Sequence, residues 1–200
     1  MSKLEEFFMS KTHQLVMVAI LSAISFCLMF VGFSIIPGAS FLKIDFSIIP
    51  ILLGLVLMDL KQAYLILAVR TLLRLALNNH GVNDLIGIPM NVIAVALFIT
   101  AFALIWHRQK GLVTYVLASL VGTGLLTLGM VIMNYVFAIP LYAKFAGFDI
   151  KASIGIARYI FTMVIPFNLL EGLIFAIVFY FVYIAGKPIL ERYPNSYHET

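Results

Sequence analysis

Residues 41–50 read Phe-Leu-Lys-Ile-Asp-Phe-Ser-Ile-Ile-Pro, a short polar and charged strip between two long apolar runs. The rest of the chain carries little charge: 63% of its 200 residues are hydrophobic, 11% are charged, and the mean hydropathy is +1.09. A charged residue between two hydrophobic spans lies at the membrane interface, is paired, or contacts a ligand. The strip therefore indicates a boundary between two membrane helices and a first candidate ligand site.

The apolar runs predict an all-α integral membrane protein with one membrane domain over residues 1–200. A run of about 20 apolar residues crosses a bilayer as a helix, and unbroken runs lack the alternation typical of a membrane barrel. We expect a bundle of six transmembrane helices at about 14–33, 48–57, 63–77, 85–106, 112–139 and 156–184. No small-residue cleavage site follows the first run, which favours a retained helix over a signal peptide.

The basic residues predict the orientation in the membrane. With six spans the two termini share a side, and an excess of lysine and arginine marks the cytoplasmic side. That side would hold Lys3, Lys11, Lys61, Arg108, Lys110, Lys187 and Arg192, and the other side Lys43, Lys144 and Lys151. We therefore expect a protein of the bacterial cell membrane with both termini in the cytoplasm. The net charge of +4 is too small and scattered to predict nucleic-acid binding.

Six costly side chains lie inside the expected spans, and each needs a protein or ligand partner because an unpaired polar group in hydrocarbon costs several kcal/mol. Asn168 and Glu171 are three residues apart and share a helix face. Amides together with aromatic rings suit a flat heteroaromatic ligand, because amides read ring donors and acceptors while rings stack on its faces. The six are Arg70, Arg74, Asn91, Asn134, Asn168 and Glu171, and the aromatic candidates are Phe41, Phe46, Tyr135, Tyr142 and Phe167.

Simpler roles compete with ligand binding at most of these positions. An asparagine in a membrane helix more often bonds a neighbouring helix than a ligand. Arg70 and Arg74 are expected to pair with a carboxylate or reach the interface, and binding of an anionic ligand is the minority alternative. Asp45 neutralises a nearby cation or contacts the ligand. For Glu171, a proton relay, a structural pair and a ligand contact all stay open.

Several signatures of catalysis are missing from the sequence. There is no phosphate-binding loop, no H-E-x-x-H, no G-x-S-x-G and no acidic cluster able to hold Mg²⁺. The chain has a single cysteine, Cys27, so neither a disulfide framework nor a cysteine metal site is expected. We predict that the chain is not an enzyme and carries no cofactor or metal.

Four segments resemble one known family in order and spacing over nearly the whole chain. They are FLKIDFSIIPILLG (41–54), IGIPMNVIA (86–94), NYVFAIPLY (134–142) and IPFNLLEG (165–172). Together they are similar to the substrate-binding S components of energy-coupling factor (ECF) vitamin transporters, and most similar to the riboflavin-specific branch.

The resemblance implies a six-helix S-component fold that binds riboflavin from outside, beneath the loop that follows the first helix. It places Phe41, Leu42 and Lys43 beside the ligand, and it matches Asn134 and Asn168 to two asparagines that contact the flavin ring. The remaining predicted ligand-binding residues, Asp45, Asn91, Tyr135 and Glu171, are expected from their residue types and positions alone. Ala19 and Ala23 match the motif by which S components dock on the membrane-embedded coupling protein. From the spacing of the two alanines alone, packing inside the bundle is a simpler explanation than docking on a partner. Two ATP-binding-cassette (ABC) ATPases would supply the energy.

One position departs from the family pattern. The riboflavin branch usually reads Pro-Phe-Asn-x-x-Lys, and this chain has Glu171 in place of the lysine. A lysine donates to ring oxygens, whereas an ionised glutamate only accepts, for example from an imide N–H. Three alternatives therefore stay open beside a riboflavin-binding subunit: an S component for another vitamin or heterocycle, an integral membrane enzyme acting on lipids, and a structural membrane subunit without a ligand.

Overall fold

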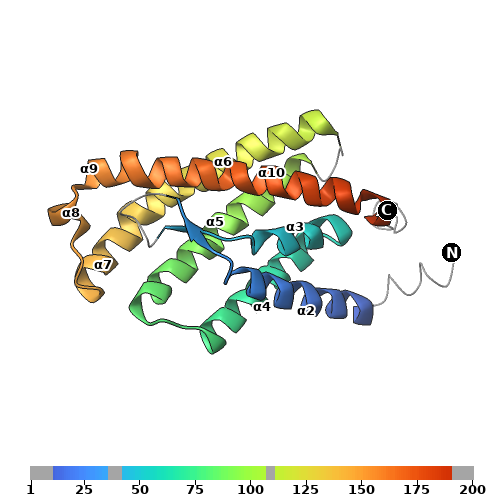
Figure 1. The fold of residues 1–200 in the computed structure, drawn as a ribbon, viewed down its shortest axis with the longest axis horizontal. Coiled ribbons are helices and arrows are strands. Elements are labelled where there is room, and N and C mark those ends of the chain that lie inside the picture. The colour runs from blue at the N-terminus through green and yellow to red at the C-terminus, as the bar shows by residue number, and fades with distance from the viewer. Residues whose placement is uncertain (1–10, 36–41, 107–110, 191–200) are drawn as a thin grey trace.

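The computed structural model describes residues 11–35, 42–106 and 111–190. Its helices run roughly along one long axis and form an elongated bundle (Figure 1). The start of α2 and the end of α10 lie at one end of the bundle, and α7 and α8 lie at the other (Figure 1). This mainly helical architecture agrees with the expected class.

The first helix is shorter than expected and leads into a small ribbon of two strands. Helix α2 (Lys11–Leu28) ends five residues before the expected boundary at 33. Strand β1 (Phe33–Ser34) then pairs antiparallel with β2 (Lys43–Ile44), with Phe33 opposite Ile44. The strip at residues 41–50 therefore supplies the second strand, and the pairing satisfies backbone groups that a chain leaving a helix would otherwise expose.

Helices α3 (Ile48–Leu57) and α4 (Leu60–Leu77) follow as a tight hairpin. The first covers the same residues as the expected helix at 48–57, and the second starts three residues earlier than expected. Asp59 makes the turn possible because its side chain accepts a hydrogen bond from the Gln62 backbone N–H at 3.0 Å and caps α4. Helix α3 is almost wholly buried inside the bundle.

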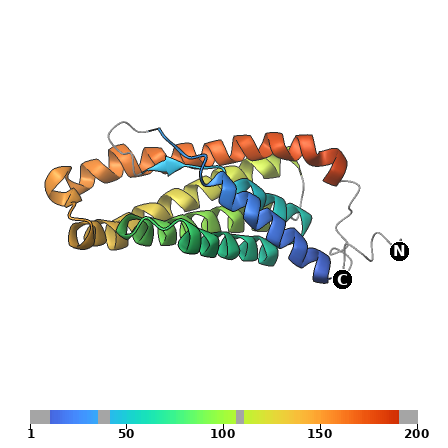
Figure 2. The ribbon, with the colours of Figure 1, turned by 60° about the horizontal axis from the view of Figure 1, so that its bottom comes forward.

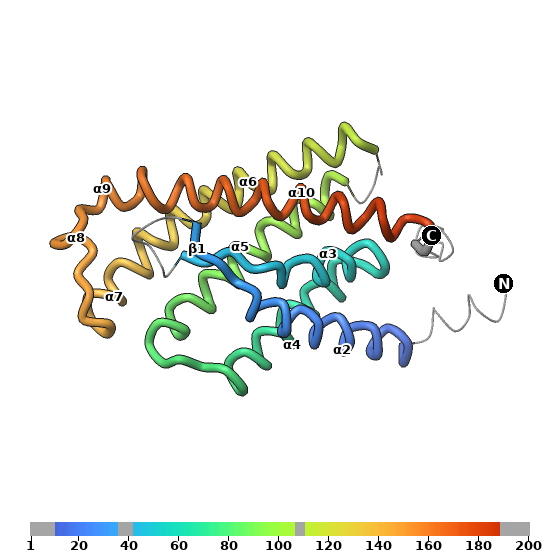
Figure 3. Tube along the Cα trace, viewed as in Figure 1, coloured from blue at the N-terminus to red at the C-terminus, as the bar shows by residue number. Residues whose placement is uncertain are grey.

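The second half consists of three long helical rods. Helix α5 (Val82–Ile105) is the first. Helix α6 (Leu112–Met133) continues through a π-helical turn, η1 (Asn134–Ala138), into α7 (Ile139–Phe145), so it extends beyond the expected end at 139. After α8 (Ile150–Ser153), helix α9 (Ile156–Tyr159) continues through a second π turn, η2 (Ile160–Val164), into α10 (Ile165–Leu190). Figure 3 shows this last rod following the long axis of the molecule.

The packing of the rods places the core and the lipid-facing surface. Helix α6 packs along α5 and α10, while α4 packs against α2 and α3. Helix α2 lies on the outside of the bundle, inclined to the long rods (Figure 2). Large aliphatic side chains on the outer faces of α2, α6 and α10 are exposed, as a protein surrounded by lipid requires.

Four helical segments in the described part of the chain are long and apolar enough to cross a membrane: Lys11–Leu28, Val82–Ile105, Leu112–Phe145 and Ile156–Pro188. This is fewer than the six spans expected from the sequence. The ten residues of α3 make a helix of about 15 Å, half the thickness of the hydrocarbon core. The interior of α4 carries Arg70 and Arg74.

Candidate functional site

Two adjoining cavities lie beside strand β2. The inner one lies between α5 and the two π-containing rods, and the outer one between the segment after α2, the end of α4 and the start of α5. The inner cavity has a volume of about 110 Å³ and the outer one about 500 Å³. Four residues line both: Lys43, Gly87, Asn91 and Tyr142. The two cavities therefore share a wall and form one candidate site with a small inner and a large outer part.

The inner cavity combines apolar walls with a few polar side chains. Leu42, Met90, Met130 and Phe167 contribute apolar and aromatic surface. The polar groups come from six different elements, so the fold gathers residues that are far apart in sequence. They are Lys43, Asn91, Asn134, Tyr142, Tyr159, Asn168 and Glu171.

Two buried asparagines have parallel roles in this wall. The Asn168 Nδ2 donates to the backbone carbonyl of Val164 at 2.7 Å, and the Asn134 Nδ2 donates to that of Met130 at 2.8 Å. Each amide thereby turns its oxygen away from its own helix. The Asn134 Oδ1 accepts from the Tyr159 hydroxyl at 2.8 Å, whereas the buried Asn168 Oδ1 has no hydrogen-bond partner among the residues that the structure describes. A buried unpaired acceptor is costly, so Asn168 offers a ready acceptor to a ligand N–H.

The π turns bring these asparagines to the cavity. Asn134 is the first residue of η1, and Val164, which accepts from Asn168, is the last residue of η2. A π turn replaces i→i+4 hydrogen bonds with i→i+5 bonds and occurs mostly as a single turn at functional sites. Both long rods therefore change helical register at the level of the cavity.

Glu171 lies one turn beyond Asn168 on α10 and is only 6% exposed. It lines the inner cavity, and none of the hydrogen bonds among the described residues involves its carboxyl group. A buried carboxyl that faces a cavity is suited to a ligand contact, because it otherwise lacks compensation for desolvation.

A network around Arg70 supports the wall from behind. Arg70 is 1% exposed and donates to the Ser47 Oγ at 2.6 Å and to the Asn91 Oδ1 at 2.9 Å. The Ser25 Oγ in turn donates to the Ser47 carbonyl at 2.5 Å, and the Ser47 N–H donates to Asp45 at 2.8 Å. The network connects α2, the segment after β2, α4 and the cavity wall on α5. Because it engages the Asn91 oxygen, it leaves the Asn91 amide nitrogen for the cavity.

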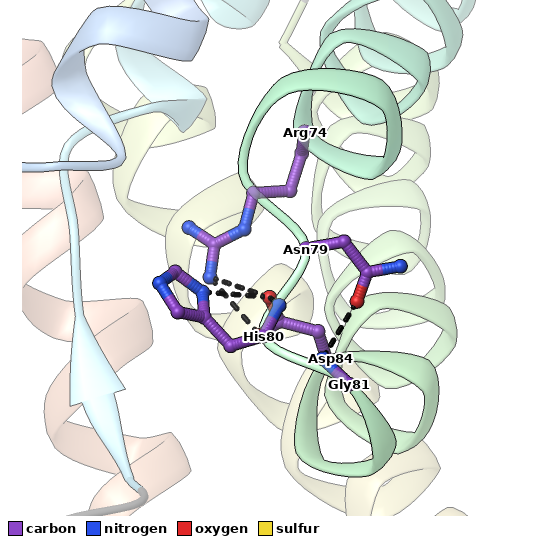
Figure 4. A network of polar contacts seen from close by, with 5 residues as sticks. All are labelled: Arg74, Asn79, His80, Gly81 and Asp84. Atoms are coloured by element: carbon purple, nitrogen blue, oxygen red, sulfur yellow. Dashed lines mark hydrogen bonds and ion pairs between the residues drawn. The ribbon is translucent and has the colours of Figure 1, made fainter.

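The outer cavity is ionic. Its polar lining includes Lys43, Asp45, Arg74, His80, Asn83 and Asp84. The Arg74 Nη2 donates to both oxygens of Asp84, at 3.0 and 3.2 Å. Asp84 also accepts from the backbone N–H of His80 at 2.9 Å and lies 3.1 Å from its Nδ1, so three groups converge on one carboxylate (Figure 4).

Comparison with known proteins identifies the family of the chain. The family model of the substrate-specific component of ECF transporters matches residues 13–183. The chain belongs to this family. The similarity first drawn from the four sequence motifs is therefore confirmed, and with it the prediction that the chain is a transport subunit and not an enzyme.

Individual relatives agree with the family. "Riboflavin transporter RibU" of Streptococcus thermophilus is 50% identical over 186 residues, which cover 93% of this chain and 88% of that protein. The protein of the same name from Leuconostoc mesenteroides is 39% identical and covers 92% of this chain and 96% of its own length. A solved S component of a bacterial ECF transporter superposes with a TM-score of 0.74 at 27% identity, over 90% of this chain and 99% of that one.

The structure of this S component gathers most of the predicted site residues. Leu42, Lys43, Asn91, Asn134, Asn168 and Glu171 line the inner cavity. Asp45 lines only the outer one. Tyr135 is not brought to either cavity: it is 63% exposed on the outer face of η1, because it follows Asn134 and is turned about 100° from it around the helix. Phe41 lies outside the described residues.

Sequence reasoning missed one polar residue of the inner wall, Tyr159, and the hydrogen-bond network around Arg70. Tyr159, at the start of the last rod, is buried and holds the Asn134 oxygen. The only sequence signal was its position nine residues before Asn168 on the same predicted helix, and a tyrosine near a helix start is equally typical of the membrane interface. The two arginines were expected to pair with carboxylates or reach the interface. Arg74 pairs with Asp84, whereas Arg70 bonds a hydroxyl and an amide.

The two predicted docking residues lie on the outside of the S component. Ala19 and Ala23 are exposed on α2, on the face opposite Val18, Leu21 and Ser22, which are buried. Packing inside the bundle, the alternative explanation of their spacing, is therefore not what the structure shows. Among the described residues no three His, Cys, Asp or Glu side chains come together as metal ligands would.

Proposed function

We propose that this S component binds riboflavin in the inner cavity and delivers it inward as part of an ECF-type ABC vitamin uptake transporter. The observation that carries the proposal is the buried Asn168 Oδ1 on α10, which has no hydrogen-bond partner among the described residues and lines a cavity walled by aromatic and aliphatic side chains. The naming of its relatives as riboflavin transporters supports the same ligand.

The chemistry of the flavin ring fits these groups. Its imide edge presents one N–H between two carbonyl oxygens. The Asn168 Oδ1 would accept from the N–H, and the free Asn91 amide nitrogen would donate to a carbonyl oxygen. Stacking against Phe167 and Tyr142 would add about 0.5–1.5 kcal/mol per aromatic pair beyond the area buried. The terms together are compatible with nanomolar affinity after the cost of immobilising the ligand.

Replacement of Asn168 by leucine tests this assignment. The change removes the acceptor for the imide N–H and leaves that N–H unpaired, so we expect riboflavin affinity to fall about ten- to a hundredfold, or about 1–3 kcal/mol. Quenching of riboflavin fluorescence by the purified protein in detergent measures the dissociation constant. The matched control is Tyr135→Leu, which changes an outward side chain at the same level and should leave the affinity unchanged. Equal losses in both variants would contradict the assignment.

Glu171 favours a second candidate, an S component for a different heterocycle. An acceptor in place of the family lysine suits a ligand with an additional N–H at that edge. A competition experiment decides between the two ligands. Other vitamins with nitrogen heterocycles are added to the complex with radiolabelled riboflavin. A vitamin that displaces it at a lower concentration than unlabelled riboflavin does would be assigned as the ligand of the site.

We further propose that the outer face of α2 docks on the membrane-embedded coupling protein, which two ABC ATPases drive. Small side chains let helices approach closely, and Ala19 and Ala23 are exposed one turn apart. Ala19→Phe should spare riboflavin binding and abolish riboflavin uptake by cells. Val113→Phe introduces the same side chain at an exposed position of α6 and should preserve uptake. Loss of binding in Ala19→Phe would argue against a docking role.

The six-span topology and the cytoplasmic position of both termini are part of the same proposal. Helix α2 begins, α4 begins and α10 ends at one end of the bundle, and these segments carry Lys11, Lys61 and Lys187 (Figure 1). Lysines near helix ends mark the cytoplasmic side. Single cysteines placed at Lys61 and Lys144 in a Cys27→Ser background should react with a membrane-impermeant maleimide on opposite sides of the cell membrane.

A further inference from the structure

The outer cavity is the part of the molecule whose chemistry the binding of a flavin ring does not explain. At about 500 Å³ it is several times larger than the inner cavity. Its lining holds two cations, Lys43 and Arg74, and two carboxylates, Asp45 and Asp84. The charges on its wall are therefore matched in number, and the surface is rich in hydrogen-bonding groups but carries almost no net charge.

Asp84 is the residue that keeps Arg74 from offering a free positive charge to the cavity. The Arg74 Nε is buried and has no acceptor in the described part of the chain, and the Arg74 Nη2 lies 3.0 and 3.2 Å from the two Asp84 oxygens. With its side chain only 15% exposed, Asp84 is held in place by the His80 backbone N–H and ring nitrogen (Figure 4). The Arg74 guanidinium is thus directed at the Asp84 carboxylate and not at the outer cavity.

The third cation nearby, Arg70, does not change this balance. It is 1% exposed and turned towards Ser47 and Asn91 behind the wall. It is not part of the lining of the outer cavity.

The shared wall places a ligand tail in this ionic space. Lys43, Gly87, Asn91 and Tyr142 line both cavities, so a ring held in the inner one has its substituent directed into the outer one. Gly87 has no side chain, and a Cβ built there would meet nothing within 4 Å, which leaves the passage between the cavities open. The tail of riboflavin is an uncharged chain of hydroxyl groups, each of which donates and accepts.

We propose that Asp84 is a specificity-determining residue: by engaging Arg74 it adapts the outer cavity to the uncharged polyhydroxy tail of the ligand and excludes a phosphorylated tail. This inference rests on the proposed binding of a flavin ring in the inner cavity. Arginine is the side chain best suited to bind phosphate in a bidentate manner. With Asp84 in place, a phosphate group would have to compete with that carboxylate for Arg74 and would meet two like charges on the wall.

The test compares three ligands: riboflavin, its 5′-phosphate ester flavin mononucleotide, and lumiflavin, which has the ring without the hydroxylated tail. Fluorescence quenching gives each dissociation constant on the purified full chain in detergent. The wild type should bind riboflavin at least about tenfold more tightly than the phosphate ester, and lumiflavin more weakly than riboflavin. Asp84→Asn keeps the shape of the side chain and one acceptor for His80, but it removes the negative charge that engages Arg74. The preference for riboflavin over the phosphate ester, measured as the ratio of the two dissociation constants, should fall by about tenfold or more.

Two further variants make the result specific. The double variant Asp84→Asn with Arg74→Gln removes both charges and should restore the preference for the uncharged tail. If Asp84→Asn alone fails to fold, the double variant can still be measured, because it leaves no unpaired charge at this site. Asp59→Asn is the matched control. It removes one carboxylate at the start of α4, far from Arg74, and keeps a side chain that can cap the helix. The ratio of the dissociation constants for the phosphate ester and riboflavin should therefore stay at the wild-type value.

Each outcome decides the proposal. Equal affinity of the wild type for riboflavin and the phosphate ester, an unchanged ratio in folded Asp84→Asn, or lumiflavin binding as tight as riboflavin would overturn it while leaving the riboflavin assignment intact. Absence of riboflavin binding by the wild type would instead overturn the proposed function, and this inference with it.

Discussion

Two arginines one turn apart on α4 have opposite surroundings. Arg70 is 1% exposed and is held by neutral groups, the Ser47 hydroxyl and the Asn91 amide oxygen. Arg74 is 18% exposed and is held by the Asp84 carboxylate at the edge of the outer cavity. One helix thus carries a cation solvated by fixed dipoles in the interior and a cation in an ion pair near the cavity mouth.

The difference shows where each charge can be changed without loss of the fold. A cation in the interior of a membrane protein is costly and depends on every hydrogen bond it makes. A partly exposed ion pair contributes little to stability because water already solvates both partners. We therefore expect the Arg70 network to maintain the shape of the inner cavity, and the Arg74 pair to be open to change as ligand preference changes.

The largest effect should come from replacing each arginine by methionine in turn. Arg70→Met leaves the Ser47 hydroxyl and the Asn91 oxygen without their donor, at about 1–3 kcal/mol for each unpaired group. Arg74→Met breaks a partly exposed pair and should cost about 1 kcal/mol or less. Denaturant unfolding of the two variants in the same detergent measures both. Similar losses of stability would show that the two surroundings do not differ in the way described.

A smaller effect is expected from placing another cation in the inner cavity. Glu171→Lys supplies a donor for a ring carbonyl oxygen, so riboflavin affinity should stay the same or rise by up to about tenfold. Glu171→Leu has similar bulk without a polar group and serves as the control, with weaker binding expected. Titration calorimetry on both variants gives the affinities. Complete loss of binding in Glu171→Lys would argue against the match of this position to the lysine of the riboflavin branch.

The smallest effect should come from the outermost hydrogen bond of the Arg70 network. Ser25→Ala removes the bond from α2 to the Ser47 carbonyl, and we expect a loss of about 0.5–1.5 kcal/mol. The control is Thr71→Ser, which keeps a hydroxyl able to bond the Leu67 carbonyl within α4 and should change stability by less. The midpoints of thermal unfolding compare the two variants. A Ser25→Ala protein as stable as the wild type would show that the hydrogen bond from α2 does not contribute to the network.

The sequence predicted the elements that depend on local composition. The apolar run at 48–57 coincides with α3, and the rarity of amides in membrane helices was enough to find Asn91, Asn134 and Asn168. The early end of α2 was not predictable, because β1 forms only by pairing with β2, with Phe33 opposite Ile44 and Ser34 opposite Lys43. Local propensity carries no information on such a pairing.

The parts of the site that were missed depend on helix rotation. Asn134 and Tyr135 are neighbours in sequence, yet one faces the cavity and the other faces outward. An aromatic residue is common on both faces of a membrane helix, so its type does not reveal its direction. The π turns add to the difficulty, since their i→i+5 bonds shift the face that the following residues present and leave no clear mark in the sequence.

These π turns also provide places where the chain can change its length. Each of η1 and η2 holds one more residue per turn than an ordinary α-helical turn would. Deleting Val136 would return η1 to α-helical winding, and because the turn loses only its extra residue, Tyr142 would keep its place in the cavity wall. A deletion in the regular part of α6 would instead rotate everything after it by about 100°. The π turns are thus the points at which these rods tolerate a change of one residue without turning the wall of the cavity.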